Sequence, residues 1–244
     1  MKENKYDEEI FFQKYGQMLR SRIGLSGAGE WETLRTMFPD VKDKRFLDLG
    51  CGYGWHCRYV SDLGAADILG VDISKKMIQI AKEKSQHYKN IRYLHCAIEE
   101  FNSKNNSWDM VFSSLAIHYL ESFHDICQKV SRFLVKEGIF LFSVEHPVFT
   151  AEGSQNWIYK EDGEILCFPV DDYYYEGKRT AHFLGEKVIK YHRTLTTYVQ
   201  ELKKAGFYIE DIVEPKPPKN MIDLPGMKDE MRRPMMLIIK AKKI

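Results

Sequence analysis

A glycine-rich stretch at the end of an apolar run constrains the fold of this chain more than any other feature. Phe46–Gly54 reads FLDLGCGYG, with three glycines in five residues. Glycine weakens a strand, so glycines crowded at its end indicate that something approaches the main chain closely. Trp55–Leu63, which follows, has helical spacing. The stretch therefore predicts a strand, a tight turn and a helix, with a ligand against the turn.

The same pattern is repeated along the chain. Ile68–Asp72 is predicted as a second strand, and Ser74 is a good N-cap for an amphipathic helix over Lys75–Lys84. Further strands are expected at Ile91–Cys96, Trp108–Ser114 and Ile139–Val144, with a helix around Ile126–Val135. Strands that alternate with helices predict an α/β fold whose parallel sheet is covered on both faces.

The alternation stops after Glu145. Residues 146–193 are rich in aromatic side chains but have no clear period. Such a segment is too apolar for a linker and too long for an ordinary connection, so we expect an insertion that packs over one end of the sheet. A helix over Thr194–Ala205 follows, with strands near Phe207–Val213 and Met235–Ala241.

Composition and charge narrow the class of protein. The 244 residues are 44% apolar and 29% charged, which is typical of a globular domain. Thirty-six basic and 35 acidic residues give a net charge of +1, which disfavours nucleic acid or an anionic membrane as a partner. The charged N-terminus and the lack of a long apolar run predict a cytoplasmic protein. Five scattered cysteines without zinc spacing are expected to be reduced thiols.

The glycine spacing favours one of two cofactor classes. Dinucleotides usually require G-x-G-x-x-G, whereas this chain has G-x-G-x-G at Gly50–Gly54 and a bulky Trp55 at the position of the last glycine. Asp72, 22 residues beyond Gly50, suits the ribose of either NAD or S-adenosylmethionine, and it could instead cap the following helix. Asp48 is expected near the ammonium group of the cofactor.

These residues resemble the motifs of the class I S-adenosylmethionine-dependent methyltransferases. FLDLGCGYG is similar to their first motif, VDIS (Val71–Ser74) to their second, HCAIEEF (His95–Phe101) to their third, and WDMVFSSLAIHYL (Trp108–Leu120) to the segment around their fourth strand. More broadly, GAGEW (Gly27–Trp31), SVEHP (Ser143–Pro147) and HRT (His192–Thr194) resemble a bacterial group of such proteins.

The resemblance implies both a fold and a cofactor site. It implies a Rossmann-like, mostly parallel sheet of seven strands with the last antiparallel, a helical cap at 1–44, a cofactor-binding core at 45–145, a substrate lid at 146–193 and a final helix and two strands at 194–244. The acid of the second motif would bind both ribose hydroxyls. The expected cofactor contacts are Tyr15, Arg20, Asp48, Gly50, Cys51, Gly52, Asp72, Ile73, Ala97, Ile98, Glu99, Ser113 and Ser114. Ala97 stands where many members have an aspartate, so the adenine would depend on main-chain contacts there.

Methyl transfer itself needs position more than chemistry from the protein, because the sulfonium group already activates the carbon. No metal or covalent residue is required. If the acceptor must lose a proton, a base is needed, and His118 and His146 are the candidates. A structural role for either histidine is an open alternative. Tyr119, Tyr174, Arg179 and His192, together with His118, are the candidate substrate contacts, although His192 also suits a structural role at a helix start.

The favoured function is methyl transfer from S-adenosylmethionine, with S-adenosylhomocysteine as product, to a small-molecule oxygen, nitrogen or carbon. The chain lacks the Asn/Asp-Pro-Pro-aromatic and Pro-Cys signatures of nucleic-acid base methylation. An NAD-dependent oxidoreductase and a non-catalytic cofactor-binding regulator stay open as alternatives, as does a homodimer.

Overall fold

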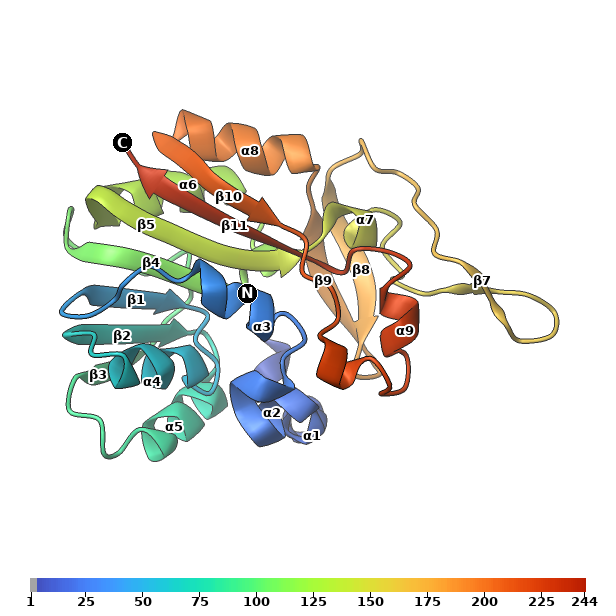
Figure 1. Cartoon of the computed structure of the whole chain (residues 1–244), viewed down its shortest axis with the longest axis horizontal. Helices are drawn as coiled ribbons and strands as arrows, with labels where there is room; N and C mark the ends of the chain where they lie inside the picture. The colour runs from blue at the N-terminus through green and yellow to red at the C-terminus, as the bar shows by residue number, and fades with distance from the viewer. Residues whose placement is uncertain (1–3) are drawn as a thin grey trace.

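A twisted sheet forms the centre of the molecule (Figure 1). The computed structural model describes residues 4–244, and within them the largest sheet has seven strands in the order β10-β11-β5-β4-β1-β2-β3. The strands are β1 (Arg45–Leu49), β2 (Asp67–Asp72), β3 (Ile91–His95), β4 (Trp108–Ser114), β5 (Leu134–Glu145), β10 (Phe207–Val213) and β11 (Met236–Lys243).

The strand directions confirm the predicted fold. β1 pairs in parallel with β2 and β4, β2 with β3, and β4 with β5, whereas β11 runs antiparallel to both β5 and β10. The chain builds outward from β1 to β3 and then returns to the other side of β1 as β4. The strand order reverses between β1 and β4, and a ligand crevice is expected at the carboxyl ends of the strands at such a point.

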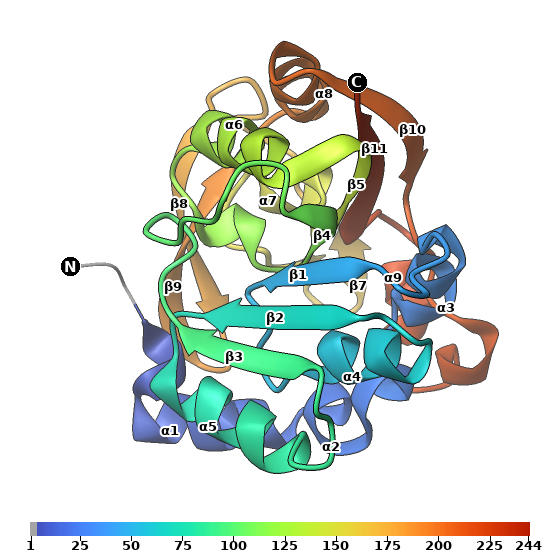
Figure 2. The same ribbon diagram turned by 90° about the vertical axis from the view of Figure 1, so that its left-hand side faces the viewer.

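Helices cover both faces of the sheet (Figures 1 and 2). Alternate residues of β1 point to opposite faces, so Phe46 packs in the core under α4 (Trp55–Asp62) and Leu47 packs in the core under α6 (Phe123–Phe133). α5 (Lys75–Lys84) shares the first face, and α8 (Leu195–Lys204) shares the second. The hydroxyls of Ser74, Ser122 and Thr194 cap α5, α6 and α8 by accepting from main-chain N–H groups.

The N-terminal segment begins at the carboxyl ends of the strands, and its Trp31, Leu34 and Met37 then pack in the core on the α4 face of the sheet. It contains η1 (Lys5–Asp7), α1 (Glu9–Gln17), α2 (Leu19–Ile23), η2 (Gly24–Gly27), α3 (Trp31–Leu34) and η3 (Arg35–Met37). Asp7 fixes its beginning, because its carboxylate accepts from Ser74 Oγ at 2.6 Å and from Lys76 N at 3.1 Å at the start of α5.

The segment after β5 contains a hairpin that the sequence pattern did not predict. β8 (Gly177–Phe183) and β9 (Glu186–His192) pair antiparallel and are joined by Leu184 and Gly185, both at positive φ. Two such residues favour the turn twist that a two-residue hairpin needs. Shorter elements are η4 (Ile117–Tyr119), α7 (Pro147–Thr150), β6 (Ile158–Tyr159), β7 (Ile165–Cys167), η5 (Lys219–Met221) and α9 (Met227–Glu230).

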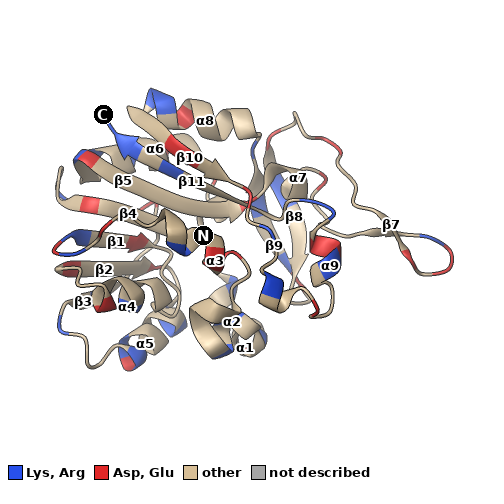
Figure 3. Ribbon diagram, viewed as in Figure 1, with Lys and Arg blue, Asp and Glu red and all other residues tan. Residues whose placement is uncertain are grey.

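Charge and helix length add two observations on the described residues. Figure 3 shows acidic and basic residues interspersed over the ribbon without a continuous basic stripe. No helix within residues 4–244 combines the length and the apolar character that crossing a membrane requires.

Candidate functional site

A cavity of about 720 Å³ opens at the carboxyl ends of the central strands. Its lining comes from the N-terminal segment, the turn after β1, the end of β2, η4 and the β8–β9 hairpin, with 215–217 and 227–236 closing the remaining side. The volume lies within the range of roughly 300–1,000 Å³ found for small-molecule sites. Segments far apart in the sequence therefore enclose one space.

The glycine turn after β1 is open on the side of this cavity. Gly50 has φ +81°, and a Cβ there would lie 2.4 Å from the Cβ of Ala116. Gly52 has φ +50°, and an added Cβ would meet no protein atom within 4 Å. The N–H groups of Gly50 and Cys51 both donate to Val71 O, which holds the turn over the end of β2. Gly50 is thus required by protein packing, whereas Gly52 leaves its backbone accessible from the cavity.

Asp72 ends β2 at the edge of the cavity. One carboxylate oxygen accepts from Gly52 N and the other from Ser74 N, both at 2.8 Å. Burial raises the pKa of Asp72, and these two main-chain donors oppose that rise. Ser74, not Asp72, caps α5. Each oxygen keeps a lone pair for a further donor, and Asp72 lines the cavity.

Asp48 and Cys51 differ from the expectation of direct cofactor contact, because neither lines the cavity. Asp48 is fully buried, Cys57 Sγ donates to its Oδ2 at 3.4 Å, and its Oδ1 has no partner. Burial raises the pKa of Asp48 to about 7. Asp48 lies on the strand face that is covered by α4, so its carboxylate points into the core and not toward the cofactor.

The third and fourth motifs are also only partly at the cavity. Ile73, Ile98, Glu99 and Ser114 line it. Ala97 does not, because its side chain is buried, and its carbonyl accepts from Phe101 N at 2.9 Å in the turn after β3. Ser113 is fully buried and donates to Leu49 O at 2.7 Å. Successive residues of β4 face opposite sides of the sheet, so Ser113 and Ser114 do not share the cavity.

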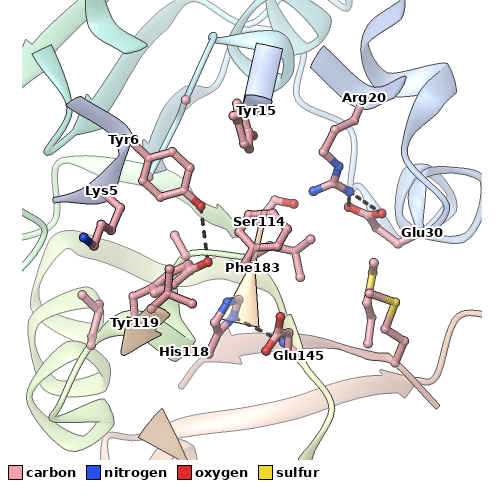
Figure 4. A pocket seen from close by; sticks show the side chains of 18 of the residues that line it. Lys5, Tyr6, Tyr15, Arg20, Glu30, Ser114, His118, Tyr119, Glu145 and Phe183 are labelled. Carbon is pink, nitrogen blue, oxygen red and sulfur yellow. Dashed lines mark hydrogen bonds and ion pairs between the residues drawn. The ribbon is translucent and has the colours of Figure 1, made fainter. Parts of the chain in front are cut away.

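Tyr15 and Arg20 reach the cavity from the N-terminal helices, as Figure 4 shows. Arg20 Nη2 contacts both carboxylate oxygens of Glu30, at 2.5 and 2.7 Å, and Glu30 is buried. The GAGEW segment thereby acquires a structural meaning. Gly27 allows close passage, because a Cβ there would lie 2.7 Å from the Leu19 carbonyl, and Glu30 orients Arg20.

His118 and Tyr119 project from η4 into the opposite part of the cavity (Figure 4). His118 Nδ1 accepts from Glu145 N at 3.3 Å. Burial lowers the pKa of His118 to about 4. The Tyr119 hydroxyl lies 3.3 Å from that of Tyr6, and burial raises the pKa of both tyrosines. The three side chains present polar hydrogens at neutral pH.

A buried ion pair stands behind His118. Lys190 Nζ lies 2.5 Å from Glu145 Oε1 and donates to Gln155 Oε1, while Gln155 Nε2 donates to Glu145 Oε2 at 2.6 Å. Burial alone raises the pKa of Glu145, but His118, Lys190 and these hydrogen bonds outweigh it and hold the pKa below its ordinary value. Both carboxylate oxygens are therefore engaged.

His146 is not brought to the cavity, contrary to its prediction as a base. Its Nδ1 accepts from Val148 N at 3.0 Å as the N-cap of α7, and its Nε2 lies 2.9 Å from Glu214 Oε1 without the alignment of a hydrogen bond. The ring is buried. Glu145 does not orient it, because the Glu145 side chain turns to Lys190.

Three predicted substrate contacts also lie elsewhere, since none of them lines the cavity. Tyr174 is 88% exposed. Arg179 Nε donates to Ala151 O at 2.7 Å, and its Nη2 donates to Tyr175 O, so it fixes the path of the insertion. His192 is fully buried between Thr150 Oγ1 and Tyr173 O, at 2.8 and 2.9 Å. The polar atoms of Arg179 and His192 are used by the protein itself.

Trp55, whose size argued against a dinucleotide, does not enter the cavity either. Its ring packs where a Cβ on Gly24 would lie, 2.7 Å away, and Arg58 stacks over it at 4.5 Å. The indole therefore does not block the glycine turn.

Several lining residues were not found from the sequence. They include Tyr6, Glu30, Glu145, Phe183, Val188, Met227, Met235 and Met236. Glu30 and Glu145 lie in the GAGEW and SVEHP segments, which gave them no role at the cavity, and no local motif marks the others. Apolar and polar residues alternate over a short stretch that includes Phe183 and Val188. That alternation was the signal in the sequence from which the hairpin could have been predicted.

Comparison with known proteins gives a consistent result. Residues 47–142 match the family model of a methyltransferase domain. A Listeria monocytogenes crystal structure assigned as an S-adenosylmethionine-dependent methyltransferase is 52% identical, with a TM-score of 0.86 over 91% of this chain and 99% of that one. One from Mesorhizobium loti is 37% identical, with a TM-score of 0.84 over 90% and 100%. An uncharacterized protein of Haemophilus influenzae is 32% identical over 98% of this chain and 96% of its own length.

Proposed function

Because this chain belongs to the S-adenosylmethionine-dependent methyltransferases, we propose that it methylates a small molecule held in the cavity beneath the N-terminal helices and the β8–β9 hairpin. The convergence of distant segments on that cavity is the observation that carries the proposal. A polymer would need a long groove, whereas here the N-terminal segment, the ends of the central strands, η4, the β8–β9 hairpin and residues 215–236 all line one space of about 720 Å³. The net charge of +1 and the acidic and basic residues interspersed along the ribbon in Figure 3 also disfavour a nucleic acid as the acceptor.

The residues at one end of the cavity fit the cofactor. Gly52 offers main chain that no side chain covers, and Asp72 keeps acceptor capacity for two ribose hydroxyls. Ile73, Ile98 and Glu99 would surround the nucleoside, and Ser114 the methionine part. Arg20, fixed by Glu30, would bind the cofactor's carboxylate, with Tyr15 beside it.

S-adenosylmethionine supplies a methyl group that is already activated for displacement. What the protein adds is position, since holding two reactants in near-attack geometry can contribute roughly 7–11 kcal/mol. His118 and Tyr119 stand at the other end of the cavity from α1 and α2, where an acceptor would meet the methyl group (Figure 4).

Calorimetry and an assay of S-adenosylhomocysteine formation test this function. We expect S-adenosylhomocysteine to bind at micromolar concentration, NAD not to bind, and at least one compound in a panel of small acids, phenols, amines and activated carbons to be methylated with formation of S-adenosylhomocysteine. Binding without turnover of any small molecule, together with methylation of bulk tRNA or protein, would refute the small-molecule proposal. Binding with no turnover on either class would favour a cofactor-binding regulator.

A further inference from the structure

The hydrogen bonding of His118 fixes which of its ring nitrogens carries the proton. Nδ1 accepts from the main-chain N–H of Glu145 at 3.3 Å, and a nitrogen that accepts carries no hydrogen, so the proton of the neutral ring is on Nε2. Within residues 4–244 the bond to Nδ1 is the one hydrogen bond that the His118 ring makes, so Nε2 has no protein partner there, and His118 lines the cavity. A protonated Nε2 can donate a hydrogen bond but cannot take a proton.

The main-chain donor that sets this state is held in place. Glu145 ends β5, where Met236 of β11 is its register partner. Its side chain is fixed by Lys190 on one oxygen and by Gln155 on the other. Lys190 is nearly fully buried, so this pair is shielded from solvent. The ring cannot exchange its tautomer without losing the Glu145 hydrogen bond.

The charged and titratable groups around the ring keep it neutral. Burial is the largest influence and lowers the pKa of His118 to about 4; Glu145 opposes this, and Lys190 on β9 and Arg193 after β9 reinforce it. Tyr119 on η4 and Tyr6 on η1 also face this region, and burial raises the pKa of each. All three rings are neutral near pH 7.

The remaining carboxylates of the cavity are engaged or lie at its opening. Both oxygens of Glu145, of Glu30 and of Glu230 are paired, and Asp72 accepts two main-chain donors. Glu99 and Glu121 are exposed. The interior around η4 thus offers polar hydrogens from His118 and from whichever of Tyr119 and Tyr6 does not donate to the other, but no unengaged base.

We propose that His118 donates a hydrogen bond from Nε2 to the acceptor and is not a general base, and that the acceptor is a carboxylate, which is methylated as the anion. This rests on the proposed function. A carboxylate oxygen forms the new O–CH₃ bond as the S–CH₃ bond breaks with its electron pair on sulfur, giving a methyl ester and the neutral thioether, and no proton leaves. A hydroxyl or an amine would have to lose a proton to a group that the interior lacks.

Nitrogen-15 NMR of labelled histidine tests the donor role of His118 without requiring enzyme turnover. The signals of His118 are assigned with the His118→Leu variant. In the cofactor-free protein we expect the Nε2–H tautomer, neutral from pH 9 down to about pH 5. An Nδ1–H tautomer, or a titration near pH 6.5, would overturn the donor role.

Probes that share one ring test the acceptor class. Benzoate, phenol and aniline are compared for formation of S-adenosylhomocysteine from S-adenosylmethionine and, by calorimetry, for binding to the protein with S-adenosylhomocysteine. We expect turnover of benzoate but not of phenol or aniline, because a missing base typically costs about 10²–10⁴-fold for an acceptor that must lose a proton. Benzoate has no proton to lose, so its rate should not vary between pH 6 and 9. His118→Leu should weaken benzoate binding by roughly ten- to 100-fold, since a hydrogen bond to a charged group is lost.

Two variants distinguish the loss of the His118 hydrogen bond from a general structural effect of substituting a histidine. His118→Asn keeps an N–H donor and should recover part of the benzoate affinity, and His124→Gln, which alters an exposed histidine on α6, should match the wild type. Methylation of phenol or aniline with a rate that rises with pH, and loss of that rise in His118→Asn, would overturn the inference while leaving the methyltransferase function intact. A failure to bind S-adenosylhomocysteine would instead refute the proposed function.

Discussion

Alanine at Gly52 separates two reasons for having a glycine in the turn after β1. The added Cβ meets no protein atom within 4 Å, so the protein loses only the backbone preference against φ +50°. That preference is about 1–2 kcal/mol for an L-residue in the left-handed region. For a chain of this length the melting temperature should fall by about 2–8 °C.

The effect on the cofactor should be larger than this backbone effect suggests. The open space beside Gly52 belongs to the cavity, and a methyl group there would displace a ligand packed against the main chain. We expect S-adenosylhomocysteine to bind at least tenfold more weakly, which corresponds to about 1.4 kcal/mol. Isothermal calorimetry measures this change, and thermal unfolding measures the stability of the same sample.

Gly206→Ala is the matched control. Gly206 follows α8, has φ +82°, and an added Cβ there also meets nothing within 4 Å, but it does not line the cavity. It should lose comparable stability and keep its affinity. If Gly52→Ala is destabilised like Gly206→Ala and still binds S-adenosylhomocysteine as the wild type does, the cofactor does not lie against this turn and the reasoning is refuted.

Three further predictions concern the same site. Asp72→Ala should weaken S-adenosylhomocysteine binding at least tenfold in calorimetry, because two acceptor oxygens are lost. Asp67→Ala, which removes an exposed ion pair with Arg92, should not weaken it. If Asp72→Ala bound as tightly as the wild type, Asp72 would only hold the glycine turn after β1 and would not contact the cofactor. Gly50→Ala should destabilise the protein in urea unfolding because its Cβ would lie 2.4 Å from that of Ala116, and Ala116→Gly should recover part of the loss; no recovery would contradict the packing argument. The folded-state pKa of His118, about 4, is below its ordinary value of 6.5, so the unfolded chain binds the proton first. Stability should therefore fall between pH 6.5 and 4, by up to about 3 kcal/mol from this residue at 1.36 kcal/mol per pH unit; a His118→Phe variant with an equally steep acid limb would argue against a neutral buried ring.

The regular core was predictable because its signals are local. Trp108–Ser114 and Phe207–Val213 have the predicted strand bounds, and Lys75–Lys84 is a helix capped by Ser74 as expected. Hydrophobic period, glycine position and cap chemistry act over a few residues, so the sequence carries them directly.

The candidate site was predictable only where it follows from a strand end. Gly50, Gly52 and Asp72 line the cavity because the carboxyl ends of parallel strands meet at one edge. Ser113 points away from the cavity because facing alternates along a strand and Ser114 lines the cavity. Asp48 shares the face of Phe46 and is therefore buried under α4, where Cys57 contacts it. His146, Arg179 and His192 have residue types that suit a site, but they do not line the cavity, because each is bound to other parts of the protein.

The sequence alone determined the alternation of strands and helices from β1 to β5 and from α8 to β11, the glycine turn and the acid at the end of β2, because each depends on neighbours in the chain. Only the tertiary structure decided which side chains share the cavity and in what chemical state. Lys190 and Glu145 are 45 residues apart, and their pairing exists only once the β8–β9 hairpin has folded against the end of β5. The hydrogen bond from Glu145 N that fixes the proton of His118 likewise requires η4 to pack against β5. A tautomer and a buried ion pair are properties of an environment, and long-range packing creates that environment.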